Sequence, residues 1–206
     1  MGKGMAANII KAGIELYVFT RTKSKIRAME EMGAKAAESV ADLTTKVDLI
    51  LACLPNEETS KRVFLGEEGV VDASKKGQVL VDHSTVNPNL SRRIYDMAAK
   101  KKVSFLDAPI SGGPDGAAAG TLAIMVGGDK DAVGKAMNGF EAMGDTILHM
   151  GPSGSGTITK LVNQVLVGIH TLAACEALLL GNKGGADPNK LMTILKNAWG
   201  SSTMLD

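Results

Sequence analysis

Short apolar runs rich in β-branched residues alternate with stretches of helical spacing along roughly the first 150 residues. The apolar runs predict strands at Leu16–Phe19, Val47–Leu54, Gln78–Asp82, Val103–Leu106, Leu122–Val126 and Thr146–Met150. Several are apolar throughout rather than alternating, as expected for strands covered on both faces. The intervening stretches predict helices at Met5–Ala12, Ser24–Met32, Ser39–Lys46, Glu57–Val63, Pro88–Lys100 and Asp129–Met143. Because such alternation implies parallel pairing through right-handed crossovers, we expect an α/β fold with a doubly wound parallel sheet.

Residues at the ends of these helices support their boundaries. Ser24, Ser39 and Asp129 are predicted N-caps, since their side chains accept hydrogen bonds from the free N–H groups of a first helical turn. Gly13 and Gly33 follow helices, where glycine is favoured as a cap.

After Met150 the pattern becomes wholly helical. The expected elements are a flexible hinge, one long helix and one shorter helix: Gly151–Gly156, about Thr157–Asn182, and Asp187 to about Ala198. We therefore expect a sheet domain over residues 1–150 and the amino-terminal part of an all-α domain over residues 151–206.

The composition is that of a globular protein. Of 206 residues, 45% are hydrophobic, and 23 basic against 22 acidic side chains leave a net charge of +1. These values exclude disorder and give no electrostatic reason to expect nucleic acid or an anionic membrane as a partner. Cys53 and Cys175 lie in apolar segments and predict reduced, core-filling thiols. Neither has the neighbouring Cys or His of a close-spaced metal site, so no metal is expected.

The most apolar stretch, Val165–Leu180, contains polar interruptions and falls short of the roughly 18 apolar residues of a membrane span. We expect it to be a buried helix. Met1–Met5 lacks the apolar core of a signal peptide. We expect a cytoplasmic protein, and an organellar location stays open because a missing presequence would have carried that signal.

The chain opens with Met1-Gly2-Lys3-Gly4-Met5, which is similar to the end of a phosphate-binding glycine loop running into a helix. The N-terminus of such a helix holds a pyrophosphate. The strand and first glycines of that fingerprint are absent, so an unstructured amino terminus is the alternative.

Thr20-Arg21-Thr22 ends the strand that follows this first helix, at the position that recognises the ribose in dinucleotide-binding folds. An acidic residue there binds a free 2′-hydroxyl, whereas arginine favours a 2′-phosphate. The pattern therefore favours NADP(H) and leaves NAD(H) open, with a solvated basic turn as the alternative.

Ser84 and Thr85 follow a predicted strand at its carboxyl edge, where ligands of open α/β sheets collect. Capping of the next helix is the alternative. His83, His149 and His170 share no motif, and we expect each to be structural.

Asp107, Pro109, Ser111 and several glycines lie on one predicted loop after a strand. Successive N–H groups of such a loop form an anion nest suited to a carboxylate. A glycine-rich turn without a ligand is the alternative.

Lys160, Asn163, Gln164 and Val167 fall on one face of the long predicted helix, since positions three and four apart are neighbours. A lysine and an amide pair on an otherwise apolar helix are costly to bury without a purpose. The alternative is a lysine whose ammonium reaches solvent at the helix start.

In this order along nearly the whole chain, these segments resemble the β-hydroxyacid dehydrogenase family, which includes 3-hydroxyisobutyrate dehydrogenase and tartronate semialdehyde reductase. The matching segments are the glycine-loop end, Thr20-Arg21, Leu54-Pro55, Asp82-x-Ser84-Thr85, Asp107-x-Pro109-x-Ser111-Gly112-Gly113, and the helix with Gly156, Lys160 and Asn163. Asn163-Gln164 and the carboxyl-terminal Gly200–Asp206 are closest to the tartronate semialdehyde reductase branch. Related 6-phosphogluconate dehydrogenases would carry histidine at position 163.

The resemblance implies reversible hydride transfer between NADP(H) and a small β-hydroxyacid or semialdehyde. It implies Lys160 as the general acid or base, and substrate contacts from Ser111, Gly112, Gly113 and Asn163. Cofactor contacts are implied for Gly2, Thr20, Arg21, Thr22, Leu54, Pro55 and Thr85. The implied partner is a small-molecule hydroxyacid or semialdehyde, and a homo-oligomer stays open.

The chain departs from the family at both ends. The first, central strand of a Rossmann-type doubly wound parallel sheet has no counterpart, which would leave two flanking strands with unpaired backbone groups across a vacant slot. The all-α domain stops after its first helices. We interpret the sequence as truncated, and a catalytically silent module for dinucleotide binding or assembly is the second hypothesis.

Overall fold

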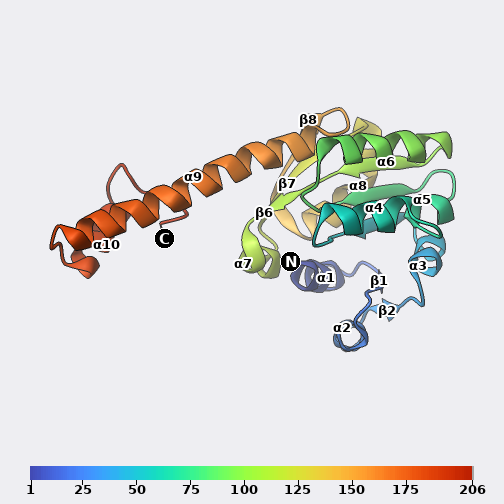
Figure 1. Cartoon of the computed structure of the whole chain (residues 1–206). Helices are drawn as coiled ribbons and strands as arrows, with labels where there is room; N and C mark the ends of the chain where they lie inside the picture. The colour runs from blue at the N-terminus through green and yellow to red at the C-terminus, as the bar shows by residue number, and fades with distance from the viewer. Residues whose placement is uncertain (206) are drawn as a thin grey trace. The chain divides into compact units, whose positions relative to one another are not determined.

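A computed structural model describes residues 1–205 (Figure 1). The chain divides into two compact units, Met1–Lys160 and the residues from Leu161 onward. The first unit contains a two-stranded and a six-stranded sheet with their helices, and the second is helical. The predicted domain boundary after residue 150 stays a prediction.

The elements of the first unit are α1 (Gly2–Lys11), β1 (Tyr17–Val18), α2 (Lys23–Glu30), β2 (Lys35–Ala36), α3 (Val40–Lys46), β3 (Leu49–Ala52), α4 (Glu57–Leu65), α5 (Val70–Ala73), β4 (Val79–Asp82), α6 (Pro88–Lys100), β5 (Ser104–Asp107), β6 (Ile110–Ser111), α7 (Gly113–Ala119), β7 (Leu122–Gly127), α8 (Lys130–Glu141) and β8 (Gly144–Gly151). Helix α9 (Ser155–Lys183) begins in the first unit and continues into the second, which also contains α10 (Pro188–Lys196). Each predicted strand and helix has a counterpart here. The short elements β2, α5, β6 and α7 were not predicted, because a few residues carry no readable periodicity.

The α/β class and the Rossmann-type arrangement are confirmed, although the sheet is mixed. Its order is β3-β4-β5-β7-β6, with β8 beside β7. Strands β3, β4 and β5 pair in parallel as expected, whereas β7 runs antiparallel to β5 and β6. The direction reverses because β6 continues in the direction of β5, and the chain then turns back through the short helix α7 instead of crossing over a face.

Strands β1 and β2 form a separate parallel pair. Within residues 1–205 no ladder joins β1 to β3, so each of these two strands has one unpaired edge. Leu16, Leu49 and Leu51 pack against the core but stay partly exposed. This is the arrangement expected of a doubly wound sheet that lacks its central strand.

The six-stranded sheet has a hydrophobic cluster on each face. On one face Val79, Val81 and Leu106 join residues of α1, α7 and α8. On the other face Leu80 and Phe105 join residues of α4, α5 and α6. Alternate residues of β4 and β5 thus point to opposite helical layers, as the pleat of a strand requires.

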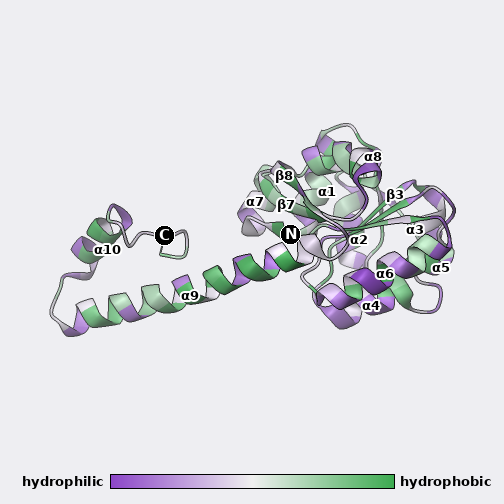
Figure 2. Cartoon of the chain, turned by 90° about the horizontal axis from the view of Figure 1, so that it is seen from above, coloured by the Kyte–Doolittle hydropathy of each residue, from purple (hydrophilic) through white to green (hydrophobic). Residues whose placement is uncertain are grey.

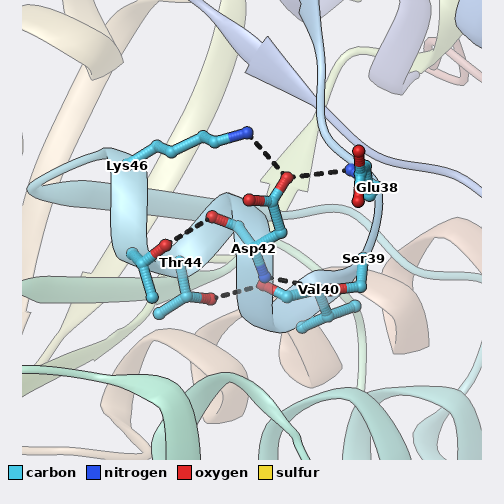
Figure 3. Close-up of polar contacts among 7 residues, drawn as sticks. Glu38, Ser39, Val40, Asp42, Thr44 and Lys46 are labelled. Atoms are coloured by element: carbon cyan, nitrogen blue, oxygen red, sulfur yellow. Dashed lines mark hydrogen bonds and ion pairs between the residues drawn. The ribbon is translucent and has the colours of Figure 1, made fainter.

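Local capping explains where helix α3 begins. Ser39 accepts a hydrogen bond from Asp42 N at 2.9 Å, as predicted for an N-cap. Figure 3 shows the Asp42 carboxylate accepting from Glu38 N at 2.9 Å and from Lys46 Nζ at 2.7 Å. A carboxylate in the first turn and an ammonium in the last both complement the helix dipole.

Two other residues predicted as N-caps do not cap their helices in the structure. The expected cap Ser24 lies inside α2, because the extended backbone of Thr22 already begins that helix. Asp129 holds the N-cap position of α8, but its carboxylate accepts from Tyr95 Oη at 2.9 Å instead of capping the helix.

The prediction that the apolar helix is buried is wrong for the described residues. In α9 only Gly156, Thr157 and Lys160 are buried, and Figure 2 shows hydrophobic residues along its length. Its large apolar side chains are mostly exposed, because the second unit has only α10 as another helix among its described residues. By length and composition alone α9 would suffice to cross a membrane, a test that core helices of soluble proteins also pass.

The cysteines do not fill the core as predicted. Both Cys53 and Cys175 are exposed. Cys53 follows β3, the strand with the unpaired edge, and Cys175 lies on the uncovered part of α9.

Gly156 is a packing constraint at the start of α9. A Cβ there would lie 2.2 Å from the Met125 carbonyl oxygen and 2.4 Å from that of Asp107. We expect Gly156→Ala to lower the free energy of unfolding by about 2–3 kcal/mol, because backbone must move to admit the methyl group. Urea denaturation monitored by circular dichroism measures this.

The matched control is Gly134→Ala on α8, where an added Cβ meets nothing within 4 Å. This variant should be neutral or more stable by about 0.5–1 kcal/mol, since alanine is the better helix former. Equal losses of stability in the two variants would contradict the packing explanation.

Candidate active site at the carboxyl edge of the sheet

The carboxyl ends of β3, β4 and β5 meet at one edge of the sheet. Ala52 pairs with Asp82, and Asp82 pairs with Asp107 in the parallel register. The residues after these three strands therefore gather at one edge, where ligands of open α/β sheets bind.

Asp82 ties the turn after β3 to this edge. Its carboxylate is 1% exposed and accepts from the Ser60 hydroxyl of α4 and from Ser84 N at 2.9 Å. Ser84 Oγ in turn accepts from Leu54 N at 2.9 Å. Desolvation raises the pKa of Asp82, and the bonds from Ser60 and Ser84 partly offset this. Ser60 was not predicted, because a serine inside a helix carries no sequence signal.

Neither Ser84 nor Thr85 caps the next helix, so that alternative is wrong. The N-cap of α6 is Asn87, whose side chain accepts from Asn89 N. Thr85 is exposed just after β4, and Pro55 is exposed just after Leu54.

His83 is a buried structural residue. Its Nδ1 lies 2.7 Å from the Ala108 carbonyl oxygen, and its ring meets Phe140 edge-on with centroids 5.8 Å apart. Nε2 is buried without a partner among residues 1–205. Burial lowers the pKa of His83 to about 4, so the imidazole is neutral. This geometry fits the structural role expected from the sequence.

Asp107 holds the start of α9. Its carboxylate is 1% exposed and accepts from Gly154 N at 2.7 Å, Thr157 N at 2.8 Å and Thr157 Oγ1 at 3.0 Å. The segment Gly151–Gly156, predicted as a flexible hinge, is thus bonded to the sheet. Asp107 was expected only as part of a ligand loop, because no sequence signal pairs it with residues so far along the chain.

Lys160 lies one turn after Thr157 in α9. Its side chain is 8% exposed and has no hydrogen bond or ion pair among residues 1–205. Burial lowers the pKa of Lys160. The lysine is thus largely withdrawn from water, which is unlike a surface lysine and suits a proton donor.

The predicted anion loop is in fact a strand end and a helix start. Ser111 ends β6, and Gly112 is the N-cap of α7. Gly112 has φ +133° and Gly113 has φ +65°, which L side chains rarely adopt. A glycine pair here lets the backbone turn from strand into helix with its N–H groups exposed. Both glycines are exposed, and Ser111 is half-buried.

The amino terminus is helical, so the alternative of an unstructured start is wrong. Gly2 is exposed in the first turn of α1, and an added Cβ would meet nothing within 4 Å. Desolvation raises the pKa of the Cys53 thiol, and the amino terminus and Gly2 N–H partly offset this. The start of α1 therefore lies beside the carboxyl end of β3. Asn8 Nδ2 donates to the Ala117 carbonyl oxygen at 2.9 Å and binds α1 to α7.

Two groups of predicted residues belong to other parts of the chain. Thr20, Arg21 and Thr22 follow β1 in the separate two-stranded sheet, and Arg21 and Thr22 are exposed. Asn163 belongs to the second unit, three positions after Lys160 in the same helix. Their roles stay predictions. Within residues 1–205 no three His, Cys, Asp or Glu side chains converge in a way that could hold a metal.

Two family models match the chain in succession. Residues 1–151 match the NAD binding domain of 6-phosphogluconate dehydrogenase. Residues 154–206 match the NAD-binding domain of NADP-dependent 3-hydroxyisobutyrate dehydrogenase.

Two proteins with similar sequences are named as dehydrogenases. The chain is 36% identical over 206 residues to the NAD-dependent L-serine dehydrogenase of Pseudomonas aeruginosa, covering 100% of this chain and 69% of that protein. It is 39% identical over 198 residues to a probable mitochondrial 3-hydroxyisobutyrate dehydrogenase of Dictyostelium discoideum, covering 96% of this chain and 62% of that one. The chain thus spans about two thirds of the length of these relatives.

A solved structure has the same fold. Mycobacterium tuberculosis 3-hydroxyisobutyrate dehydrogenase with L-serine superposes with a TM-score of 0.89 at 29% identity, covering 100% of this chain and 69% of that one.

The lowered pKa of His83 predicts that the stability of the fold depends on pH. Above its ordinary pKa of 6.5 the imidazole is neutral in both the folded and the unfolded chain, and below it only the unfolded chain takes up a proton. The contribution of His83 to the free energy of unfolding should therefore fall as the pH drops from 7 to 5, by roughly 2 kcal/mol. Urea denaturation across this range measures the slope.

His83→Asn removes the titrating group and should flatten this slope. His170→Asn, on the exposed part of α9, is the control and should leave it unchanged. An unaltered slope in His83→Asn would show that other groups cause it.

Proposed function

Because the chain belongs to the β-hydroxyacid dehydrogenase family, we propose that it carries a site for NAD(P)-dependent hydride transfer to and from a small hydroxyacid or semialdehyde. The observation that carries this proposal is that Lys160 is buried and has no ionic partner among the described residues. It follows Thr157 by one helical turn, and Thr157 is bonded to Asp107 at the carboxyl edge of the sheet. We propose NADP(H) as the preferred cofactor and tartronate semialdehyde as a substrate, with 3-hydroxyisobutyrate of the same class.

Lys160 is the proposed general acid in reduction. Its ammonium donates a proton to the carbonyl oxygen of the substrate, and in oxidation the neutral amine takes that proton back. Burial lowers its pKa, which makes the ammonium a stronger proton donor than that of a solvated lysine. When bound, the nicotinamide ring supplies or accepts the hydride at the substrate carbon.

The proposed carboxylate site is Ser111-Gly112-Gly113. The two glycines expose backbone N–H groups at the start of α7, and the Ser111 hydroxyl adds a donor. Such groups complement a substrate carboxylate. Asn163 is proposed to orient the substrate from the helix that carries Lys160.

The proposed cofactor contacts follow the sheet edge. The first turn of α1 at Gly2 is proposed to present backbone N–H groups to a pyrophosphate, and an added Cβ at Gly2 would meet nothing within 4 Å. Leu54, Pro55 and Thr85 follow the ends of β3 and β4 and would contact the remainder of the dinucleotide. Thr20, Arg21 and Thr22 are proposed to bind the ribose 2′-phosphate.

Replacing Lys160 tests the proton-transfer role. Lys160→Met keeps an apolar stem and removes the amine, so kcat for the reduction of tartronate semialdehyde should fall by about 10²–10⁴-fold. NADPH oxidation followed at 340 nm measures the rate. The rate of the unmodified chain should also decline as the pH rises through the lowered pKa of Lys160, because the ammonium is the donor.

Lys183→Met is the matched control, since Lys183 is an exposed lysine in the last turn of the same helix. Its kcat should stay within about twofold of the unmodified chain. Activity that survives in Lys160→Met would remove the lysine from the mechanism. NADPH binding without any turnover by the unmodified chain would favour the silent dinucleotide-binding module.

Replacing Arg21 tests the cofactor preference. Arg21→Asp places a negative charge where the 2′-phosphate is expected, so the ratio of kcat/KM for NADPH to that for NADH should fall by about 10-fold or more. Fluorescence titration gives the same comparison as a ratio of dissociation constants. Arg27→Asp on the exposed side of α2 has the same charge change and should leave the ratio unaltered. A ratio unchanged by Arg21→Asp would refute the assigned role.

A further inference from the structure

Asp107 makes an unusual connection between a strand end and a distant helix. Three donors of the α9 start, Gly154 N, Thr157 N and Thr157 Oγ1, point at one carboxylate that ends β5. The carboxylate thus serves as the N-cap of α9, although it lies 50 positions from Thr157 in the chain. A negative charge at this end also complements the helix dipole.

The surroundings leave this first turn little freedom. Gly156 N lies 2.8 Å from the point that a Cβ on Gly127 would occupy, and the Asp107 Oδ1 lies 2.6 Å from the same point. Thr157 Oγ1 also lies 3.1 Å from Ser91 Oγ of α6. The start of α9 is therefore held between two strand ends and α6.

Lys160 follows Thr157 by three positions, so the two share one face of a continuous helix. Because they belong to the same helical turn, the position of Thr157 determines that of Lys160. All of these residues belong to the first unit, Met1–Lys160.

We propose that Asp107 is a positioning residue for Lys160, which fixes the first turn of α9 on the sheet and thereby keeps the Lys160 side chain in its largely buried place. This rests on the proposed function only for its catalytic consequence. Asp107 is not an ion-pair partner of the lysine among residues 1–205, since its carboxylate is bonded to the start of α9. The charged group nearest to Asp107 in the register is the buried Asp82 of β4.

A loosened helix start would admit water to Lys160, and its pKa would return toward the ordinary value of 10.5. Asp107→Asn keeps the shape of the side chain but turns one acceptor oxygen into a donor, so it cannot accept all three bonds. We expect the titration midpoint of the Lys160 amine to rise by about 1 pH unit in this variant.

The midpoint is measured on the intact chain by brief acetylation at a series of pH values, with the Lys160 peptide quantified by mass spectrometry. This readout needs neither cofactor nor turnover. A shifted midpoint in a chain without hydride transfer would therefore refute the proposed function and leave the positioning role standing.

Thr157 provides a graded second test. Thr157→Val removes one of the three donors and should raise the midpoint by a smaller amount, whereas Thr157→Ser retains the hydroxyl and should behave as the unmodified chain. The two Thr157 variants still test the positioning role if Asp107→Asn fails to fold. An unchanged midpoint in folded Thr157→Val and Asp107→Asn would overturn the proposal and leave Asp107 a merely stabilising residue.

Asp129→Asn is the matched control, because Asp129 holds the N-cap position of α8, a helix without a site residue. It should leave the midpoint of Lys160 unchanged whatever its effect on stability. With substrate and NADPH, Asp107→Asn should lower kcat on the order of 10- to 100-fold while the KM for NADPH changes little. Loss of NADPH binding instead would assign Asp107 to the cofactor and contradict the proposal.

Discussion

The candidate site depends on two buried carboxylates that lie side by side in the register of β4 and β5. Asp82 and Asp107 are each 1% exposed, and burial of both at adjacent positions raises their pKa values. Such carboxylates are costly to bury unless hydrogen bonds compensate. Each accepts hydrogen bonds from a helix outside the sheet, α4 for Asp82 and α9 for Asp107.

The donors divide the site into two halves. Asp82 accepts hydrogen bonds from the Ser60 hydroxyl and from Ser84 N. The Ser84 hydroxyl in turn accepts from Leu54 N and holds the turn on the proposed cofactor side. Asp107 accepts hydrogen bonds from the start of α9 and so anchors the helix that carries Lys160. The Leu54 turn and the start of α9 are thus anchored to two neighbouring parallel strands, whose spacing is nearly invariant in proteins.

The mixed topology adds the third part of the site. Because β6 continues the ladder of β5 along β7, Ser111–Gly113 lies beyond the carboxyl end of β5 that carries Asp107. The two glycines occupy backbone conformations that most residues avoid, so the turn is specified locally. In contrast, β1 and β2 are not hydrogen-bonded to the larger sheet, and the residues after β1 remain the least anchored of the predicted contacts.

The sequence by itself determined the elements with strong periodicity and the parallel pairing of β3, β4 and β5, since these follow from local spacing and residue type. It also singled out the segments that we propose to carry the chemistry. It could not reveal Ser60 or Thr157 as partners of the two carboxylates, nor that Gly151–Gly156 is bound to the sheet. It also predicted burial for α9 and the cysteines, because apolar composition indicates a preference for a core but not the presence of covering elements. Only the tertiary structure decided these points, because each depends on contacts between residues far apart in the chain, which pattern and propensity do not encode.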